Sequence, residues 1–253
     1  MTRWIARAAA LLAIGVLLAW TSIARKAPLS SVAEDAAGVV ALVWHHEDSG
    51  MTNSGTAFSV DDRGRFLTCA HVVRGRRDVA LAVPGPGGEK NYPARVVAED
   101  LALDAALLEA DGVRLPAVRL GSTSGVRVGE EVVFAGFPMG YTLNADLCPT
   151  VNFGHVSALP LWRVGARSPR IPIVQIDASV SLGHSGSPLY RASTGEVIGM
   201  LKSHVRVPGL ASGEDILDIV QSIPAELVER TGIGIALPAD SLRAFLARNG
   251  VKP

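Results

Sequence analysis

Residues 181–188 read SLGHSGSP and place a serine, Ser185, directly before Gly186 and two residues after Gly183. Because glycine has no Cβ, the backbone beside such a serine can approach a bound carbonyl group closely. A nucleophilic serine needs backbone N–H groups close to the substrate carbonyl, because they stabilise the oxyanion that forms when the serine attacks that carbonyl. We therefore predict Ser185 as a nucleophile, with the N–H groups of Gly183 and Ser185 as its oxyanion hole.

A serine nucleophile also needs a base and a group that orients the base. RFLTCAHVV (65–73) places His71 at the end of a predicted strand, and LALDAALLEA (101–110) places Asp104 at the start of another. A carboxylate next to a buried strand is costly unless it has a partner, and a histidine would be one. Asp100 competes as the orienting group, but the apolar strand follows Asp104. We predict His71 as the base and Asp104 as its orienter.

The rest of the chain consists mostly of short apolar segments separated by turn residues. About a dozen strands at hairpin spacing favour a β-sandwich or β-barrels over a parallel α/β fold. Two helical segments are also predicted, one over 213–230 that Pro224 interrupts and one over ADSLRAFLARNG near the end of the chain. The predicted strands cover 39–44, 55–60, 65–70, 78–83, 94–99, 104–110, 131–137, 150–159, 170–178, 187–192, 196–203 and 232–237.

These motifs together resemble the trypsin-like serine proteases of the HtrA (Deg) type. The order His71, Asp104, Ser185 is that of the chymotrypsin-type triad. The resemblance implies an all-β, chymotrypsin-like fold of two six-stranded antiparallel β-barrels with a C-terminal helix. The first barrel would supply His71 and Asp104, and the second Ser185. The segments that carry it are GTAFSVDDRGRFLTCAHVV, VVAEDLALDAALLEA, VGEEVVFAGFPMG, TVNFGHVSAL, QIDASVSLGHSGSPLY and GIGIALP.

The resemblance also implies peptide-bond hydrolysis, polypeptide substrates and no cofactor or metal. We expect Met200, Leu201, Lys202 and Ser203 to pair with the substrate backbone as an added strand. The match runs from about residue 38 to 249, and the few residues after it leave no room for a PDZ domain in this chain. The expected division is 1–24 signal peptide or membrane anchor, 25–37 linker, and 38–253 protease domain, with barrels at about 38–125 and 126–238 and a helix at 239–249.

Some residues depart from the family pattern. His184 stands where the family usually has Asn or Asp, Ser187 replaces the commoner second glycine, and the segment 204–231 is longer than usual. His184 either scaffolds the serine loop or modulates it with pH. His155, in a predicted strand of the second barrel, has either a structural role or a role in a substrate pocket.

The N-terminal segment reads as an export signal. Arg3 and Arg7 precede an apolar run from Ala8 to Trp20, the pattern of a charged n-region and an h-region. Two alternatives stay open: a signal peptide cleaved near residue 24, or a retained anchor that would hold the chain to the membrane through residues 5–24. Either one predicts an exported, periplasmic or other extracytoplasmic location.

Composition excludes several other classes of partner. Lys and Arg total 24, as do Asp and Glu, so no net charge favours nucleic acid. The sequence contains neither the CxxC nor the HExxH spacing of common zinc sites. The adjacent His45 and His46 would point to opposite faces of a strand, so they would not bind one metal ion together. In an exported chain, Cys69 and Cys148 are either a disulfide or two separate thiols.

Three functional classes follow from these observations. The first is an exported serine endopeptidase, for which quality control of envelope proteins is a candidate role. The second is a non-catalytic or latent protease-fold module that binds polypeptides as a holdase. The third, an α/β-hydrolase esterase, fits poorly, because its Gly-x-Ser-x-Gly turn leads from a strand into a helix, whereas a predicted strand follows Ser185.

Overall fold

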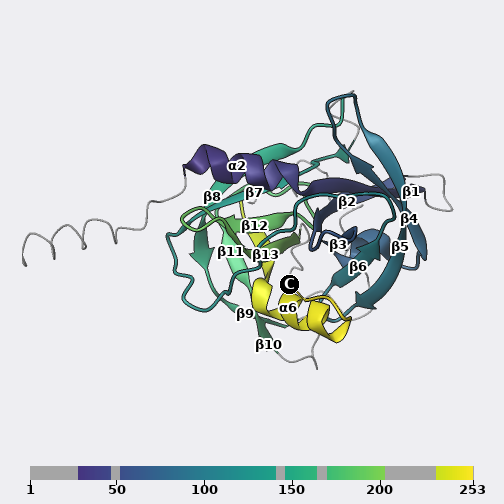
Figure 1. The fold of residues 1–253 in the computed structure, drawn as a ribbon. Helices are drawn as coiled ribbons and strands as arrows, with labels where there is room; N and C mark the ends of the chain where they lie inside the picture. Colours follow the sequence, from purple (N-terminus) through teal and green to yellow (C-terminus); the bar gives the residue numbers. More distant parts are fainter. Residues whose placement is uncertain (1–27, 47–51, 141–145, 164–169, 203–231, 253) are drawn as a thin grey trace, which may run out of the picture.

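The computed structural model describes residues 28–46, 52–140, 146–163, 170–202 and 232–252. Its strands form two closed antiparallel six-stranded β-barrels, which lie side by side (Figure 1). The predicted fold class is therefore confirmed. The predicted signal or anchor segment 1–24 and the predicted helix at 213–230 lie outside the described residues. Within the described part of the chain, no helix is long and apolar enough to cross a membrane.

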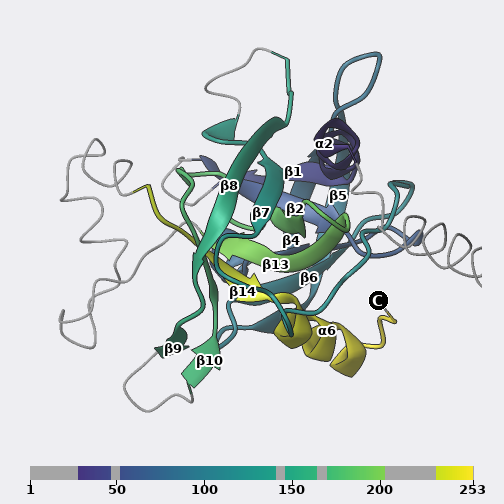
Figure 2. The same ribbon diagram turned by 90° about the vertical axis from the view of Figure 1, so that its left-hand side faces the viewer.

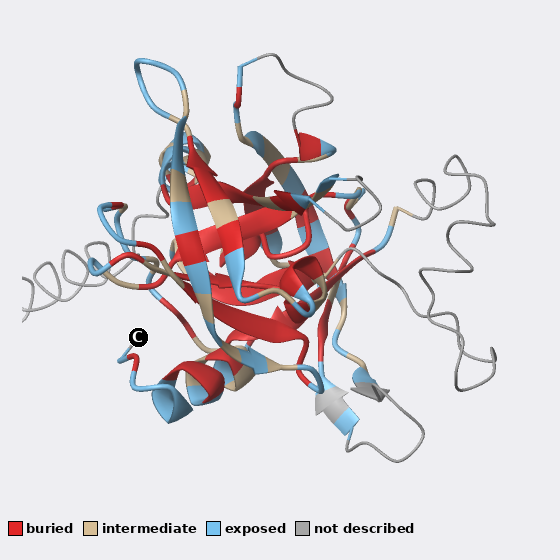
Figure 3. Cartoon of the chain, turned by 90° about the vertical axis from the view of Figure 1, so that its right-hand side faces the viewer, coloured by how far each residue is buried: buried red, intermediate tan, exposed pale blue. Residues whose placement is uncertain are grey.

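The first barrel has the strand order β1-β2-β3-β6-β5-β4 and closes where β1 pairs with β4. Its strands carry large apolar side chains with no exposed surface, including Leu42, Phe58 and Phe66, and buried residues run along the strands of the barrels (Figure 3). Burial of each such side chain contributes about 1.5–3 kcal/mol. The strands are β1 (Val40–His46), β2 (Thr52–Ser59), β3 (Arg65–Thr68), β4 (Asp78–Val83), β5 (Lys90–Asp100) and β6 (Ala105–Glu109).

The second barrel has the order β11-β14-β13-β12-β7-β8. Phe134, Ile176 and Ile198 are fully buried in its separate core. A small hairpin, β9 (Leu161–Arg163) with β10 (Arg170–Pro172), projects away from this barrel (Figure 2). The barrel strands are β7 (Glu131–Gly136), β8 (Thr150–Ala158), β11 (Val174–Ile176), β12 (Pro188–Arg191), β13 (Glu196–Lys202) and β14 (Gly234–Pro238).

Three helices complete the described structure, and one of them corrects a prediction. The segment expected to be a linker forms helix α2 (Leu29–Gly38) from residue 29 on. Val32 and Ala36, four residues apart, share one buried face of α2, which packs on β7 and β8 (Figure 1). Helix α6 (Ala239–Arg248) follows β14 directly and matches the predicted C-terminal helix.

The third helix is a single turn, α3 (Ala70–Val73). The predicted strand 65–70 therefore ends at Thr68, two residues early. The turn buries Val72 and Val73 on the first barrel. His71 belongs to the same turn, and its side chain faces the second barrel.

The two cysteines do not form a disulfide. Cys69 is a buried free thiol and Cys148 an exposed one. Of the two alternatives, separate thiols describe this structure.

Candidate active site

His71 lies between a carboxylate and a hydroxyl group. Its Nδ1 is 2.9 Å from Oδ2 and 3.1 Å from Oδ1 of Asp104, and its Nε2 is 2.9 Å from Oγ of Ser185. An ionised carboxylate can only accept, so the Nδ1 atom carries the ring proton. Nε2 is then the acceptor for the Ser185 hydroxyl. The structure thus brings together all three residues predicted as the triad, from positions 33 and 114 residues apart in the sequence.

Asp104 is held in an uncommon backbone conformation. Its φ of 62° lies in the left-handed region, which non-glycine residues seldom adopt. Oδ1 also accepts a hydrogen bond from the backbone N–H of His71 at 2.9 Å, so both the ring and the main chain of the base are fixed by one carboxylate. Burial by itself would raise the pKa of Asp104, but the His71 hydrogen bonds and the charge of Lys202 hold it well below its usual range.

The competing orienter, Asp100, is used elsewhere. Its Oδ1 accepts the Leu103 N–H at 2.9 Å, and its Oδ2 lies 3.0 Å from Arg248 of α6. Asp100 therefore closes the turn that leads to Asp104 and anchors it to the C-terminal helix.

The Ser185 loop depends on two glycines with positive φ. Gly183 has a φ of 94° and Gly186 a φ of 89°. A Cβ atom on Gly183 would lie 2.2 Å from the carbonyl oxygen of Phe137, and one on Gly186 would lie 1.9 Å from that of Thr56. No other residue type fits either position without moving the backbone.

The first barrel also holds this loop in place. On β2, Thr56 donates its N–H to the Ser185 carbonyl at 2.8 Å and its hydroxyl to the Gly183 carbonyl at 2.7 Å. Gly186 donates to the Leu201 carbonyl at 2.8 Å. The N–H of Gly183 has no acceptor among the described residues. It is therefore available to a bound oxyanion, as the prediction requires.

His184 is buried inside the same loop. Its Nδ1 accepts the Ser181 N–H at 3.2 Å, so Nε2 carries the proton. Nε2 lies 3.2 Å from the side-chain amide of Asn152 on β8, which must present its oxygen to accept that proton. The ring edge packs on Phe134. Burial lowers the pKa of His184 to about 4, so it scaffolds the loop as a neutral ring at physiological pH.

Two of the four residues predicted to pair with the substrate backbone are already paired within the second barrel. Met200 and Leu201 are completely buried. Both edges of β13 are occupied there: Met200 pairs with Pro188 and Leu237, and Leu201 bonds to the 186–187 backbone and pairs with Ala236. Neither residue can receive an added strand, because its backbone groups are already used. Ser203 lies outside the described residues.

Lys202, the last residue of β13, has a contact that the sequence did not reveal. Its Nζ lies 2.5 Å from Oδ2 of Asp104. No local pattern could have indicated this pair, since the two residues are far apart in the chain and belong to different barrels.

Residues that could bind a metal ion form hydrogen bonds within the protein instead. Cys69, His71 and Asp104 bring possible ligand atoms within 4.8 Å of one another. The Cys69 thiol, however, donates to the Leu201 carbonyl, and burial raises its pKa well above the usual value, so it is a neutral thiol. His45 donates from Nε2 to the Val72 carbonyl at 3.0 Å and so braces α3 from β1.

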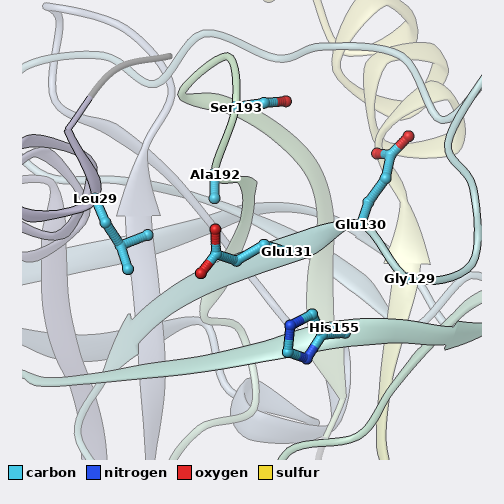
Figure 4. Close-up of a pocket in the computed structure, with 7 residues that line it drawn as sticks. All are labelled: Leu29, Gly129, Glu130, Glu131, His155, Ala192 and Ser193. Atoms are coloured by element: carbon cyan, nitrogen blue, oxygen red, sulfur yellow. The ribbon is translucent and has the colours of Figure 1, made fainter.

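A separate hollow lies at the other end of β12 from Ser185, next to the start of α2 (Figure 4). Glu130, Glu131 and His155 are its titratable lining residues. Glu130 pairs with Arg191 at 2.9 Å, and His155 pairs with Asp177 at 3.4 Å. His155 therefore lies away from the triad, beside Asp177 at the surface.

Comparison with known proteins agrees with this geometry. The model of the trypsin-like peptidase domain matches residues 55–200. The chain belongs to the trypsin-like peptidase family. The matched region contains all three residues of the His71, Asp104 and Ser185 cluster.

The chain is also similar in sequence to individual bacterial proteases. The magnetosome formation protease MamE of Paramagnetospirillum magneticum is 32% identical over 195 residues, which cover 77% of this chain and 23% of MamE. A probable periplasmic serine endoprotease of the DegP-like kind from Halomonas elongata is 32% identical over 146 residues, or 58% of this chain and 28% of that protein. The chain thus spans about a quarter of the length of these relatives.

Among solved structures, the HtrA-type protease AlgW with a tripeptide has the same fold. It superposes with a TM-score of 0.67 at 24% identity, over 89% of this chain and 65% of AlgW. The predicted resemblance to the HtrA type is confirmed by these relatives.

Proposed function

We propose that this chain is an exported serine endopeptidase that hydrolyses peptide bonds in polypeptide substrates. The observation that carries the proposal is the unbroken chain of contacts from Asp104 through His71 to the Ser185 hydroxyl. In this arrangement a neutral imidazole can remove the serine proton, and a buried carboxylate can stabilise the imidazolium that results.

Each proposed step has a residue in position. Ser185 Oγ attacks the scissile carbonyl while His71 Nε2 takes its proton. The oxyanion that forms accepts hydrogen bonds from the N–H groups of Gly183 and Ser185, and each such donor contributes about 3–4 kcal/mol in well-studied enzymes. His71 then gives the proton to the leaving amine. Water attacks the acyl-enzyme in the same way, with His71 again as base.

Lys202 is the residue beside which we place the backbone of the bound substrate. Of the four residues predicted to form an added strand, it is the described one whose side chain is partly exposed, at 24%. We place the backbone of the substrate beside Lys202 and Ser203, past the point where β13 is paired on both edges.

The proposed setting is outside the cytoplasm. It is supported by the charged and apolar segment at residues 3–20 and by the printed name of the Halomonas relative, a probable periplasmic endoprotease. Quality control of envelope proteins is the role we propose there. Whether the segment is cleaved or retained, the barrels would lie on the same side of the membrane.

The second candidate is a non-catalytic or latent module that binds polypeptides. It is favoured by His184 in the serine loop, where the family usually has Asn or Asp. The buried ring of His184 bonds to the Ser181 N–H within the loop and packs on Phe134, which argues against a disrupted loop.

Cleavage of β-casein, a protein with little fixed structure, by the full chain in a mild detergent tests the proposal. The proposal predicts fragments from the parent and none from Ser185→Ala. Ser187→Ala is the matched control: Ser187 is buried two residues away and its hydroxyl has no partner in the described structure, so this variant should still cleave. Binding of casein without cleavage by a folded parent would support the second candidate instead.

A further inference from the structure

Lys202 is aimed at the triad by the geometry of its strand. Side chains alternate between the two faces of a strand, and the neighbouring Leu201 lies in the core of the second barrel. Lys202 therefore projects from the opposite face, toward the first barrel. There its Nζ lies 2.5 Å from Oδ2 of Asp104, the oxygen that also contacts His71 Nδ1 at 2.9 Å.

One carboxylate oxygen thus serves two cationic partners when His71 is protonated. The Asp104 side chain is only 8% exposed and that of Lys202 24%, so water screens this interaction weakly. A nearby cation disfavours a second positive charge. The ammonium of Lys202 therefore opposes protonation of His71, while the carboxylate favours it.

Charged and titratable groups on the elements next to His71 contact other residues. On β1, His45 bonds to the Val72 carbonyl. On β5, Glu99 is near Arg74. Asp100 pairs with Arg248. The Cys69 thiol, which precedes α3, is neutral.

We propose that Lys202 is a positioning residue of the triad, which fixes the Asp104 carboxylate and keeps His71 neutral in more acidic solution than the triad alone would allow. The inference rests on the proposed function, since it assigns the base to His71. It extends that function to a residue outside the Ser-His-Asp set and predicts how far into the acidic range the enzyme works.

A purely structural reading of the same contact makes a different prediction. If the pair only ties β13 to the turn before β6, its loss would lower stability and leave the titration of His71 unchanged. The two readings are therefore separated by pH dependence and not by the size of an activity loss.

The test compares the full chain with Lys202→Met, which keeps the length of the side chain and removes its charge, and with Lys202→Arg, which keeps the charge. Lys90→Met, at an exposed position on β5, changes the net charge equally and serves as the control. The pH profile of kcat/KM on a casein-derived peptide is measured for each. The ring-nitrogen NMR shifts of His71 are titrated in parallel, with and without Ser185→Ala.

We expect the acid limb of Lys202→Met, and the His71 titration with it, to move up by roughly one pH unit. Lys202→Arg and Lys90→Met should follow the parent. A folded Lys202→Met whose limb and NMR titration coincide with those of the parent would overturn the inference. A parent that cleaves nothing at any pH would instead count against the proposed function, and the NMR titration would still decide the role of Lys202.

Discussion

The two sides of the candidate active site are held by different forces. On the first barrel, the base His71 is fixed by a charged network, in which one buried carboxylate contacts its ring, its main chain and a lysine. On the second barrel, the Ser185 loop contains no charged side chain. It is fixed by two glycines that only fit without a Cβ and by the buried neutral ring of His184.

This difference follows from what each side must do. The base changes its charge during the reaction, so its surroundings must balance that charge. The serine loop must present N–H groups at fixed positions, which depends on backbone geometry. Thr56 joins the two sides, since it belongs to the first barrel and bonds to the carbonyls of both Gly183 and Ser185. Mutations should therefore act through charge on one side and through shape on the other.

Asp104→Asn should give the largest effect. An amide would present N–H groups to His71 Nδ1 and favour the wrong tautomer, with the proton on Nε2. We expect kcat to fall by about 10⁴-fold, with the fold retained in circular dichroism. A loss of less than tenfold would show that the carboxylate is not the orienter of the base.

Gly183→Ala should give the second largest effect, through shape alone. The new methyl group would meet the Phe137 carbonyl at 2.2 Å, and the displaced loop would lose an oxyanion donor. We expect kcat/KM to fall by about 10²–10³-fold. In both this variant and its control, activity is measured beside the free energy of unfolding.

Gly195→Ala is the matched control for that variant. Gly195 also has a positive φ, of 65°, but its Cβ would have only Val32 at 4.0 Å. It should lose about 1–2 kcal/mol of stability and keep its activity. Equal activity losses at the two glycines would contradict the assignment of Gly183 to the oxyanion hole.

His184 should make stability depend on pH. Its pKa in the folded chain, about 4, lies below the ordinary value of 6.5. As the pH falls from 6.5 toward 4, the unfolded chain therefore binds a proton that the native chain does not, and stability drops by about 3 kcal/mol.

Denaturant unfolding of the parent and of His184→Asn at several pH values checks this. The variant should lack that part of the pH dependence, and His155→Asn, at an exposed histidine, should keep it. The Asp104 contribution falls in a separate window, below about pH 4, because the pKa of that group is lowered. A parent whose stability is flat between pH 7 and 4.5 would exclude the neutral scaffold role.

The smallest effect should come from an ion pair on the outside of the first barrel. Arg95 and Glu109 lie 2.6 Å apart, but their side chains are 65% and 38% exposed. We expect Glu109→Gln to change the free energy of unfolding by less than about 0.5 kcal/mol and to leave activity unchanged. A fall in kcat as large as that expected for Asp104→Asn would mean that burial does not distinguish the roles of the two carboxylates.

Much of this arrangement could be predicted from the sequence because its signals are local. Short apolar segments between turn residues favoured a β-sandwich or β-barrels over a parallel α/β fold, and the resemblance of the motifs to HtrA-type proteases implied the two barrels. A histidine after a strand, an aspartate before one and a serine among glycines identified the three residues that meet. Each of these patterns fits within about ten residues.

The parts that could not be predicted depend on contacts between distant segments. Helix α2 was predicted as part of a polar linker. Its apolar face, formed by Leu29, Val32, Ala33 and Ala36, is short, and it is buried because β7 and β8 lie beneath it. The pairing that occupies both edges of β13 is set by β12 and β14. The contact of Lys202 with Asp104 joins two barrels, and no spacing in the chain encodes it.

The central claim is that His71 and Asp104 activate Ser185. Labelling the full chain with a fluorophosphonate probe, followed by mass spectrometry of the modified peptide, tests this most directly. The account predicts one adduct, on Ser185, that is lost in Ser185→Ala and His71→Ala and retained in Ser187→Ala. A folded parent that takes up no probe, or a label on any other serine, would contradict it.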